Sequence, residues 1–187
     1  HAYEKAGNAS NNFSEEVTAR VAKGLGVPAA REEILGEVRR NFDDFLAQRP
    51  KGKPFSFWMG FHEPHRAYER DSGVRFGKNL ADVKVPAYLP DMSVTRGDLA
   101  DYAVEVEWAD GHIGRALRSL EAAGELENTL IIFTADQGWV GGQAGFWGMG
   151  DHTRPLTAFD GMLQIPLIFR QPEEIPANRK TDRMVSN

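Results

Sequence analysis

Residues 128–138 read NTLIIFTADQG, and this stretch decides the fold class. Residues 129–134 carry β-branched or bulky apolar side chains, which predicts a strand with both faces buried. Strands of this kind are typical of parallel sheets that lie under helices. The polar group Asp136-Gln137-Gly138 follows directly, where the carboxyl end of such a strand opens into a loop.

The segments on either side of this strand supply helices and further strands. Residues 96–124 have apolar side chains at helical spacing, with a weak capping box at Thr95 and Asp98 and a terminating glycine at Gly124. The expected buried face of this helix consists of Leu99, Tyr102, Val106, Ile113, Leu117 and Leu120. The remaining predicted elements are a helix over residues 34–46 and buried strands over residues 55–61 and 165–169. This order predicts an α/β sheet with crossover helices.

The composition narrows the class of protein. The 187 residues are 41% hydrophobic and 26% charged, which is typical of a globular domain. The net charge of −5 and the lack of a Lys/Arg block argue against a nucleic-acid partner. No run of about 18 apolar residues occurs, so no membrane span is predicted. Because the sequence has no cysteine, it holds no disulfide, thiolate metal site or cysteine nucleophile.

Two histidines lie directly after an aromatic, apolar segment. The sequence His62-Glu63-Pro64-His65 places two imidazoles and a carboxylate at the start of a long surface loop, residues 62–90. Such a group could bind a metal ion, hold an anion or donate a proton to a leaving group. The alternative is a pair of surface histidines that caps the loop, and local spacing does not decide between these interpretations.

The Asp136-Gln137 pair carries oxygen donors for a hard cation. A carboxylate beside an amide carbonyl suits calcium or magnesium, and the glycine that follows lets the backbone approach closely. The alternative is an ordinary turn at the end of a strand, where Asp and Gly are common.

A glycine-rich loop supplies a further set of charges. Residues 150–154 include a carboxylate together with His152 and Arg154. A guanidinium is a natural bidentate partner for a tetrahedral oxyanion, which makes this loop a candidate anion site. The alternative is a solvated charged loop without a ligand.

Taken together and in this order, the segments resemble the sulfatases of the alkaline phosphatase superfamily. The matching segments are residues 53–65, residues 85–91 with Arg96, Asp98 and Tyr102, residues 110–114, 120–124 and 128–138, and residues 159–160 with 165–168. The resemblance covers roughly residues 31–172, and residues 128–138 are its most specific part. Each piece is weak alone, but the ordered combination is hard to obtain by chance.

The resemblance implies both a fold and a chemistry. The fold would be α/β, part of an alkaline-phosphatase-like sandwich with a mostly parallel sheet flanked by helices. The activity would be hydrolysis of sulfate esters of carbohydrates or small organic alcohols. Sulfatases use a formylglycine made from Cys or Ser in a Cys/Ser-x-Pro-x-Arg motif, and a divalent cation, usually calcium, polarises the sulfate oxygens.

The same resemblance implies roles for individual residues. Asp136 and Gln137 would be metal ligands, with Gln137 in place of the Asn or His of many relatives. His65 would contact the sulfate and protonate the leaving alcohol. His62, His152 and Arg154 would be substrate-binding residues, and the last two would offset the loss of a lysine that many relatives use.

Three departures from the family pattern bear on activity. No Cys occurs and no Ser precedes x-Pro-x-Arg, so the nucleophile and the paired aspartates that complete the metal site are expected before His1. Ala144 stands where the family has a histidine. Pro155, or Met149 if the loop carries an insertion, stands where many relatives have the sulfate-binding lysine. Residues 1–187 are therefore expected to be a single partial catalytic domain, lacking N-terminal and C-terminal parts and inactive alone.

Two other functions stay open at the level of sequence. A phosphodiesterase or phosphoryl-transfer enzyme of the same superfamily would use similar loops, because sulfate and phosphate esters are alike in shape. A non-catalytic binding module with the same fold is favoured by Ala144 and by the missing lysine. The resemblance further implies a periplasmic or extracellular protein, although no leader is visible, and it leaves the oligomeric state open.

Overall fold

The computed structural model describes residues 27–66, 68–149 and 157–185. These residues form two compact units, each with its own internal packing. The first unit comprises the described parts of His1–Val85 and Asp91–Gly124, and the second comprises Pro86–Pro90 and the described parts of Glu125–Asn187.

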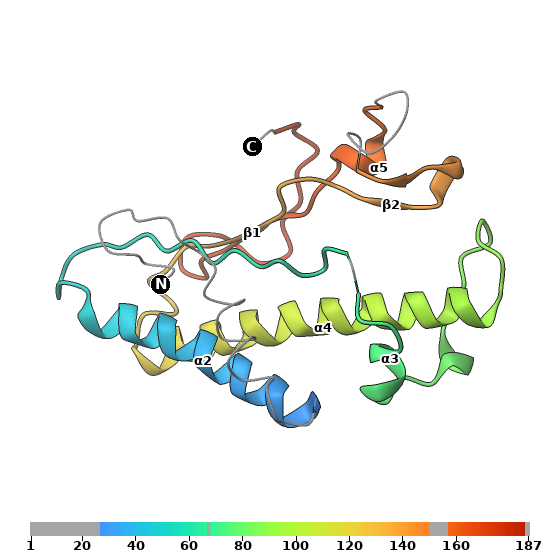
Figure 1. The fold of residues 1–187 in the computed structure, drawn as a ribbon. Coiled ribbons are helices and arrows are strands. Elements are labelled where there is room, and N and C mark those ends of the chain that lie inside the picture. Colours follow the sequence, from blue (N-terminus) through green and yellow to red (C-terminus); the bar gives the residue numbers. More distant parts are fainter. Residues whose placement is uncertain (1–26, 67, 150–156, 186–187) are drawn as a thin grey trace. The chain divides into compact units, whose positions relative to one another are not determined.

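A long helix, α4 (Ser93–Ala122), organises the first unit. It contacts every other helical element that the structure describes in this unit, namely α2 (Val27–Gln48), α3 (Ser72–Arg75) and η2 (Leu80–Asp82) (Figure 1). The helices predicted over residues 34–46 and 96–124 are thus confirmed. The predicted surface loop over residues 62–90 is not free of structure, because it contains α3 and η2.

The two ends of α4 differ in how well the sequence predicted them. Met92 is the N-cap residue and makes no side-chain capping hydrogen bond, so the predicted capping box of Thr95 and Asp98 is wrong. Asp98 instead forms an ion pair with an arginine of the preceding loop. At the other end, Gly124 adopts a φ of 71°, and its N–H donates to the carbonyl oxygen of Glu121 at 3.0 Å. Glycine supplies this left-handed conformation at helix ends, which confirms that prediction.

The buried face of α4 is lined by small and polar residues more than by bulky ones. Its buried residues are Ala100, Asp101, Val104, His112, Ser119 and Leu120. Leu120 is the single residue of the predicted face among them, and Val106 is 42% exposed. Small side chains allow neighbouring backbone to approach closely, so the bulkiest apolar stripe does not mark the most buried side of this helix.

A buried carboxylate on α4 holds the start of α3. Asp101 is 5% exposed. Its Oδ2 accepts from the N–H of Asp71 at 3.0 Å, while its Oδ1 accepts from the N–H of Gly73 at 2.7 Å and from the Ser72 hydroxyl at 3.3 Å. The charged acceptor therefore satisfies N–H groups that a helix start leaves without intrahelical partners.

Close packing requires glycine at Gly73. A Cβ at this position would lie 2.6 Å from the Cβ of Ala100 and 2.6 Å from its carbonyl carbon. Non-bonded carbon atoms prefer separations of about 3.5–4.0 Å. The start of α3 thus lies directly against the backbone of α4, and the loop between α2 and α4 is fixed at this point.

Residues 55–61 are extended but do not form a strand, so the buried strand predicted there is wrong. Burial alternates along the segment, and Trp58 is 85% exposed. The Phe57 ring packs against Phe42 and Phe45 of α2, with ring centroids 4.7 Å apart in each pair. The apolar run reflects packing of one side on helices, and no strand of the described residues pairs with it.

The second unit contains two short ribbons. The longer joins β1 (Ile131–Thr134) to β4 (Leu167–Arg170), and the shorter joins β2 (Val140–Gly141) to β3 (Trp147–Gly148). The helical turns are η3 (Gln143–Gly145) and α5 (Asp160–Leu163). Strands at both predicted positions are confirmed, and the chain is α/β in class. Both pairings that the described residues make are antiparallel, whereas a mostly parallel sheet was predicted.

The faces of β1 and β4 are more exposed than the apolar sequence predicted. Ile132 is 53% exposed and Phe133 is 42% exposed, so burial on both faces is wrong for β1. On β4, Ile168 is 57% exposed. Apolar side chains favour burial, but the described residues pair β1 with β4 alone, and these side chains stay partly exposed.

A second glycine contact fixes the loop after β1. The N–H of Gly138 donates to the carbonyl oxygen of Met162 in α5 at 2.9 Å. A Cβ on Gly138 would lie 2.4 Å from the carbonyl oxygen of Gly161 and 3.0 Å from that of Gln164. The glycine after Gln137 therefore permits a close backbone approach to α5, whereas the approach to a cation that the sequence predicted stays a prediction.

None of the helices in the described ranges combines the length and the apolar character that crossing a bilayer would require.

Replacing Asp101 by Asn is expected to destabilise the protein by about 1–3 kcal/mol, because an amide NH2 would face N–H donors in a buried site. Urea unfolding of the full chain measures this change. The matched control is Asp110→Asn, which removes an exposed carboxylate from the same helix. Equal free energies of unfolding for the two variants would contradict the role given to Asp101.

Replacing Gly138 by Ala is expected to cost about 1–3 kcal/mol, since the added methyl group overpacks against α5. The same substitution at Gly97 in α4, where a Cβ meets nothing within 4 Å, is expected to stabilise the protein by about 0.5–1 kcal/mol. Thermal unfolding of both variants tests this contrast, and a shift in the same direction for both would contradict it.

Candidate active site

The predicted histidine pair lies in residues 62–66, which we call the histidine loop, and a residue of α4 holds the start of this loop. Phe61, the residue before the pair, stacks on His112 with ring centroids 5.5 Å apart and an interplanar angle of 15°. His112 is 5% exposed and meets the Trp108 ring at 6.3 Å in an edge-on arrangement. This aromatic group fixes the point at which the extended segment passes into the loop.

His62 and His65 are brought together by a turn. The N–H of His65 donates to the carbonyl oxygen of His62 at 2.9 Å, and the two ring centroids lie 4.8 Å apart. Both residues are exposed. Two imidazoles at this separation can contact the same small anion. The sulfate contact that the resemblance implied for these residues stays a prediction.

The backbone determines which ring nitrogen of His65 faces outward. The Nδ1 atom contacts the carbonyl oxygen of Arg66. A carbonyl oxygen accepts and never donates, so Nδ1 must carry the hydrogen in this contact. The Nε2 atom is therefore the nitrogen left to bind a ligand or to transfer a proton.

The other end of the loop is held by Arg66. Its guanidinium forms an ion pair with Asp98 of α4 and lies over the Tyr68 ring, 4.4 Å from the ring centroid. Tyr68 in turn lies beside Tyr102, with ring centroids 6.0 Å apart. Burial raises the pKa of Tyr68, and the positive charge of Arg66 acts in the opposite direction.

A group of carboxylates lies near the same loop. Burial raises the pKa of Glu105, and the neighbouring charges of Glu63, Asp101 and Glu69 raise it further. Negative charge at this position would repel a sulfate group. The imidazoles, and not the carboxylates, are therefore the groups of this loop suited to an anion.

Asp136 and Gln137 follow β1 in the second unit, and both are exposed. The Nε2 atom of Gln137 contacts the sulfur of Met149. Because the amide nitrogen is the donor in this contact, the amide oxygen remains as an acceptor. The pair thus offers carboxylate and amide oxygens, which are the donors that calcium prefers.

These two residues fit a hard cation but do not complete a site. Calcium takes about 6–8 oxygen ligands, so further donors are needed. Within residues 27–66, 68–149 and 157–185, no group of three or more His, Cys, Asp and Glu side chains could hold a metal ion. The oxygen atoms of these two side chains are thus of the type that calcium binds. A complete calcium site would need most of its ligands from outside this pair.

The remaining predicted positions differ in how far they can be placed. His152 and Arg154 lie outside the described residues. His65 belongs to the first unit and Asp136 to the second, so the predicted meeting of imidazole and metal ligands stays a prediction. Met149, one of the two positions proposed for the missing lysine, is occupied by its contact with Gln137.

Sequence reasoning missed the residues that hold the histidine loop. It gave Asp98 a capping role and gave His112 no role of its own. A usable signal was present for His112, because a histidine amid apolar residues on a long amphipathic helix needs a specific environment. The Asp98–Arg66 pairing joins distant parts of the sequence and had no local signal.

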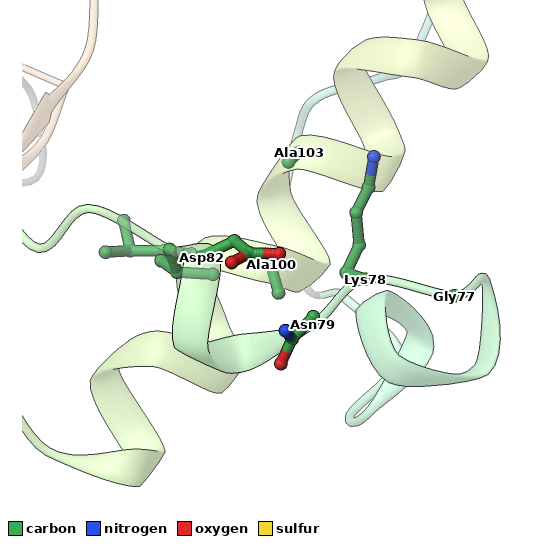
Figure 2. Close-up of a pocket in the computed structure, with 8 residues that line it drawn as sticks. Gly77, Lys78, Asn79, Asp82, Ala100 and Ala103 are labelled. Carbon is green, nitrogen blue, oxygen red and sulfur yellow. The ribbon is translucent and has the colours of Figure 1, made fainter.

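A hollow of about 400 Å³ is lined by residues of α4 and of the segment that precedes it (Figure 2). Its lining residues are Gly77, Lys78, Asn79, Asp82, Val83, Leu99, Ala100 and Ala103. Lys78 is also ion-paired with Glu107. None of the predicted site residues lines this hollow, and we give it no role in catalysis.

Comparison with known proteins places the chain among named sulfatases. An N-acetylglucosamine-6-O-sulfatase of Bacteroides thetaiotaomicron is 34% identical over 157 residues, covering 84% of this chain and 25% of that protein. A sulfatase of Formosa agariphila is 37% identical over 166 residues, covering 82% and 27%. Human N-sulphoglucosamine sulphohydrolase is 30% identical over 112 residues, covering 49% and 22%.

The chain spans about a quarter of the length of these relatives. The family described as Sulfatase matches residues 32–187, which include the histidine loop, α4 and the Asp136-Gln137 pair. The chain belongs to the sulfatase family.

Proposed function

We propose that the protein containing this chain hydrolyses sulfate esters of carbohydrates. The observation that carries the proposal is the His62–His65 pair, with rings 4.8 Å apart and with the Nε2 of His65 left outward by its Nδ1 contact. Such a pair suits a tetrahedral anion and its leaving group. Sugars are the first substrates to test, because relatives are named for N-acetylglucosamine 6-O-sulfate and N-sulphoglucosamine chemistry.

In this proposal the residues of the chain bind the sulfate and move one proton. His62 donates a hydrogen bond to a sulfate oxygen, which offsets the negative charge there. His65 gives its Nε2 proton to the alcohol oxygen as the bond between sulfur and that oxygen breaks. His152 and Arg154 are proposed as further anion-binding groups, since both carry hydrogen-bond donors suited to sulfate.

Asp136 and Gln137 would hold the divalent cation, which we propose to be calcium. When bound, the cation supplies positive charge that polarises the sulfate oxygens. The proposal also requires a formylglycine nucleophile from other parts of the protein, because the 187 residues contain no cysteine and no serine followed by x-Pro-x-Arg. The alkaline-phosphatase-like sandwich with a mostly parallel sheet, and export to the periplasm or the cell exterior, belong to the same proposal.

Replacing His65 by Ala in the full-length protein is expected to lower kcat on glucosamine 6-sulfate by about 100- to 10,000-fold, because the leaving alcohol loses its proton donor. Release of sulfate from the sugar measures this rate. Near-normal turnover would remove His65 from the mechanism. Faster hydrolysis of the matching phosphate ester by the unaltered protein would instead favour phosphoryl transfer.

Replacing Asp136 by Ala is expected to raise the calcium concentration needed for half-maximal activity by about tenfold or more, since a charged ligand is lost. Activity measured over a calcium titration after chelation tests this, with Asp110→Ala as a control at an exposed carboxylate. An unchanged calcium requirement would contradict the ligand assignment. Calcium binding by the unaltered protein without turnover of any ester would favour a binding module.

A further inference from the structure

The contact that orients His65 ends on Arg66, whose side chain is held by one residue of α4 and by a nearby tyrosine. The carbonyl oxygen of Arg66 accepts the Nδ1 hydrogen of His65, and the guanidinium of the same residue is paired with Asp98 and lies over Tyr68. Any movement of the Arg66 backbone therefore changes the position of the oxygen that holds the imidazole.

Two neighbouring contacts fix the position of this loop along α4. Asp98 and Tyr102 lie one turn apart on α4, so their side chains occupy the same side of the helix. Asp98 pairs with Arg66, while Tyr102 lies beside Tyr68 with ring centroids 6.0 Å apart. Two neighbouring contacts fix the loop more firmly than one, because a slide along the helix would break both.

The hydrogen bond to a carbonyl oxygen has a chemical consequence for His65. Rotation of the ring by half a turn would put a carbon atom in place of Nδ1 and lose the bond. The bond thus selects one ring orientation and directs Nε2 away from the backbone. Proton transfer needs such alignment, and small misplacements of a reacting group reduce rates strongly.

We infer that the Arg66–Asp98 ion pair is a positioning device for proton transfer, which keeps the Nε2 of His65 aimed at the leaving alcohol. The inference rests on the proposed function. As the S–O bond breaks, its electron pair goes to the alcohol oxygen, which takes the Nε2 proton, and the sulfur passes to the nucleophile. The ring is left neutral with its hydrogen on Nδ1, where the Arg66 carbonyl oxygen already accepts it.

The test compares two sulfate esters that differ in their need for a proton. A sugar alcohol leaves with difficulty unless it is protonated, whereas 4-nitrophenol leaves readily as an anion. Asp98→Ala in the full-length protein is expected to lower kcat on glucosamine 6-sulfate by about 10- to 100-fold. Turnover of 4-nitrophenyl sulfate by the same variant is expected to change by less than about threefold, because proton transfer is not limiting there.

Matched variants separate positioning from general damage. Glu107→Ala removes a different ion pair of α4, that with Lys78, and is expected to leave the ratio of the two rates unchanged. Asp98→Glu should restore part of the rate on the sugar ester, and Arg66→Met should reproduce the loss. Both partners are 36% exposed, so these substitutions are expected to fold, which thermal unfolding checks.

The outcomes distinguish the inference from the proposed function. Equal losses on both esters for Asp98→Ala, or no loss on either, would overturn the inference while a selective loss in His65→Ala would still uphold the function. If the unaltered full-length protein hydrolyses neither ester, the proposed function fails and the inference fails with it. A selective loss in Asp98→Ala and Arg66→Met, absent in Glu107→Ala, would support the inference.

Discussion

The buried carboxylate of Asp101 is the contact on which the first unit most depends. It binds the start of α3 through N–H groups of Asp71 and Gly73, and the backbone of Gly73 lies against that of α4. Removing one partner of a buried charged contact is costly because the other groups are left without water or a substitute. This contact therefore fixes the region that follows the histidine loop, while Phe61 and His112 fix its beginning.

Local pattern predicted the helices and the positions of β1 and β4, because each depends on side-chain spacing within one segment. It could not predict the ribbon of β1 and β4, because their pairing joins distant residues. It also could not predict that residues 55–61 form no strand. Phe57 packs on α2. The same apolar sequence pattern would occur if the segment packed in a sheet, so the pattern alone cannot distinguish the two. Whether a segment is helix or strand was thus predictable where this depends on the segment's own sequence and not on the segment that packs against it.

The candidate site shows the same division at the level of single residues. His62, His65, Asp136 and Gln137 were predicted as site residues from residue type and from order along the chain, and their roles stay predictions. The residues that hold them could not be predicted in this way. Asp98 carries the signal of a helix cap, and its pairing with Arg66 is specified by the fold alone. Supporting contacts of this kind join separate segments and leave no local pattern.

The two halves of the proposed chemistry place different demands on the protein. A proton moves over a short distance along a defined line, so the donor must be held in orientation, and His65 is fixed by its Nδ1 contact and by the turn to His62. Calcium accepts variable numbers of oxygen ligands in flexible geometry, so exposed donors such as Asp136 and Gln137 need less support. Contacts at Phe61 and Arg66 hold the histidine loop while both imidazoles stay exposed. After β1, Gly138 is held against α5 while the side chains of Asp136 and Gln137 stay exposed, which suits the proposed chemistry.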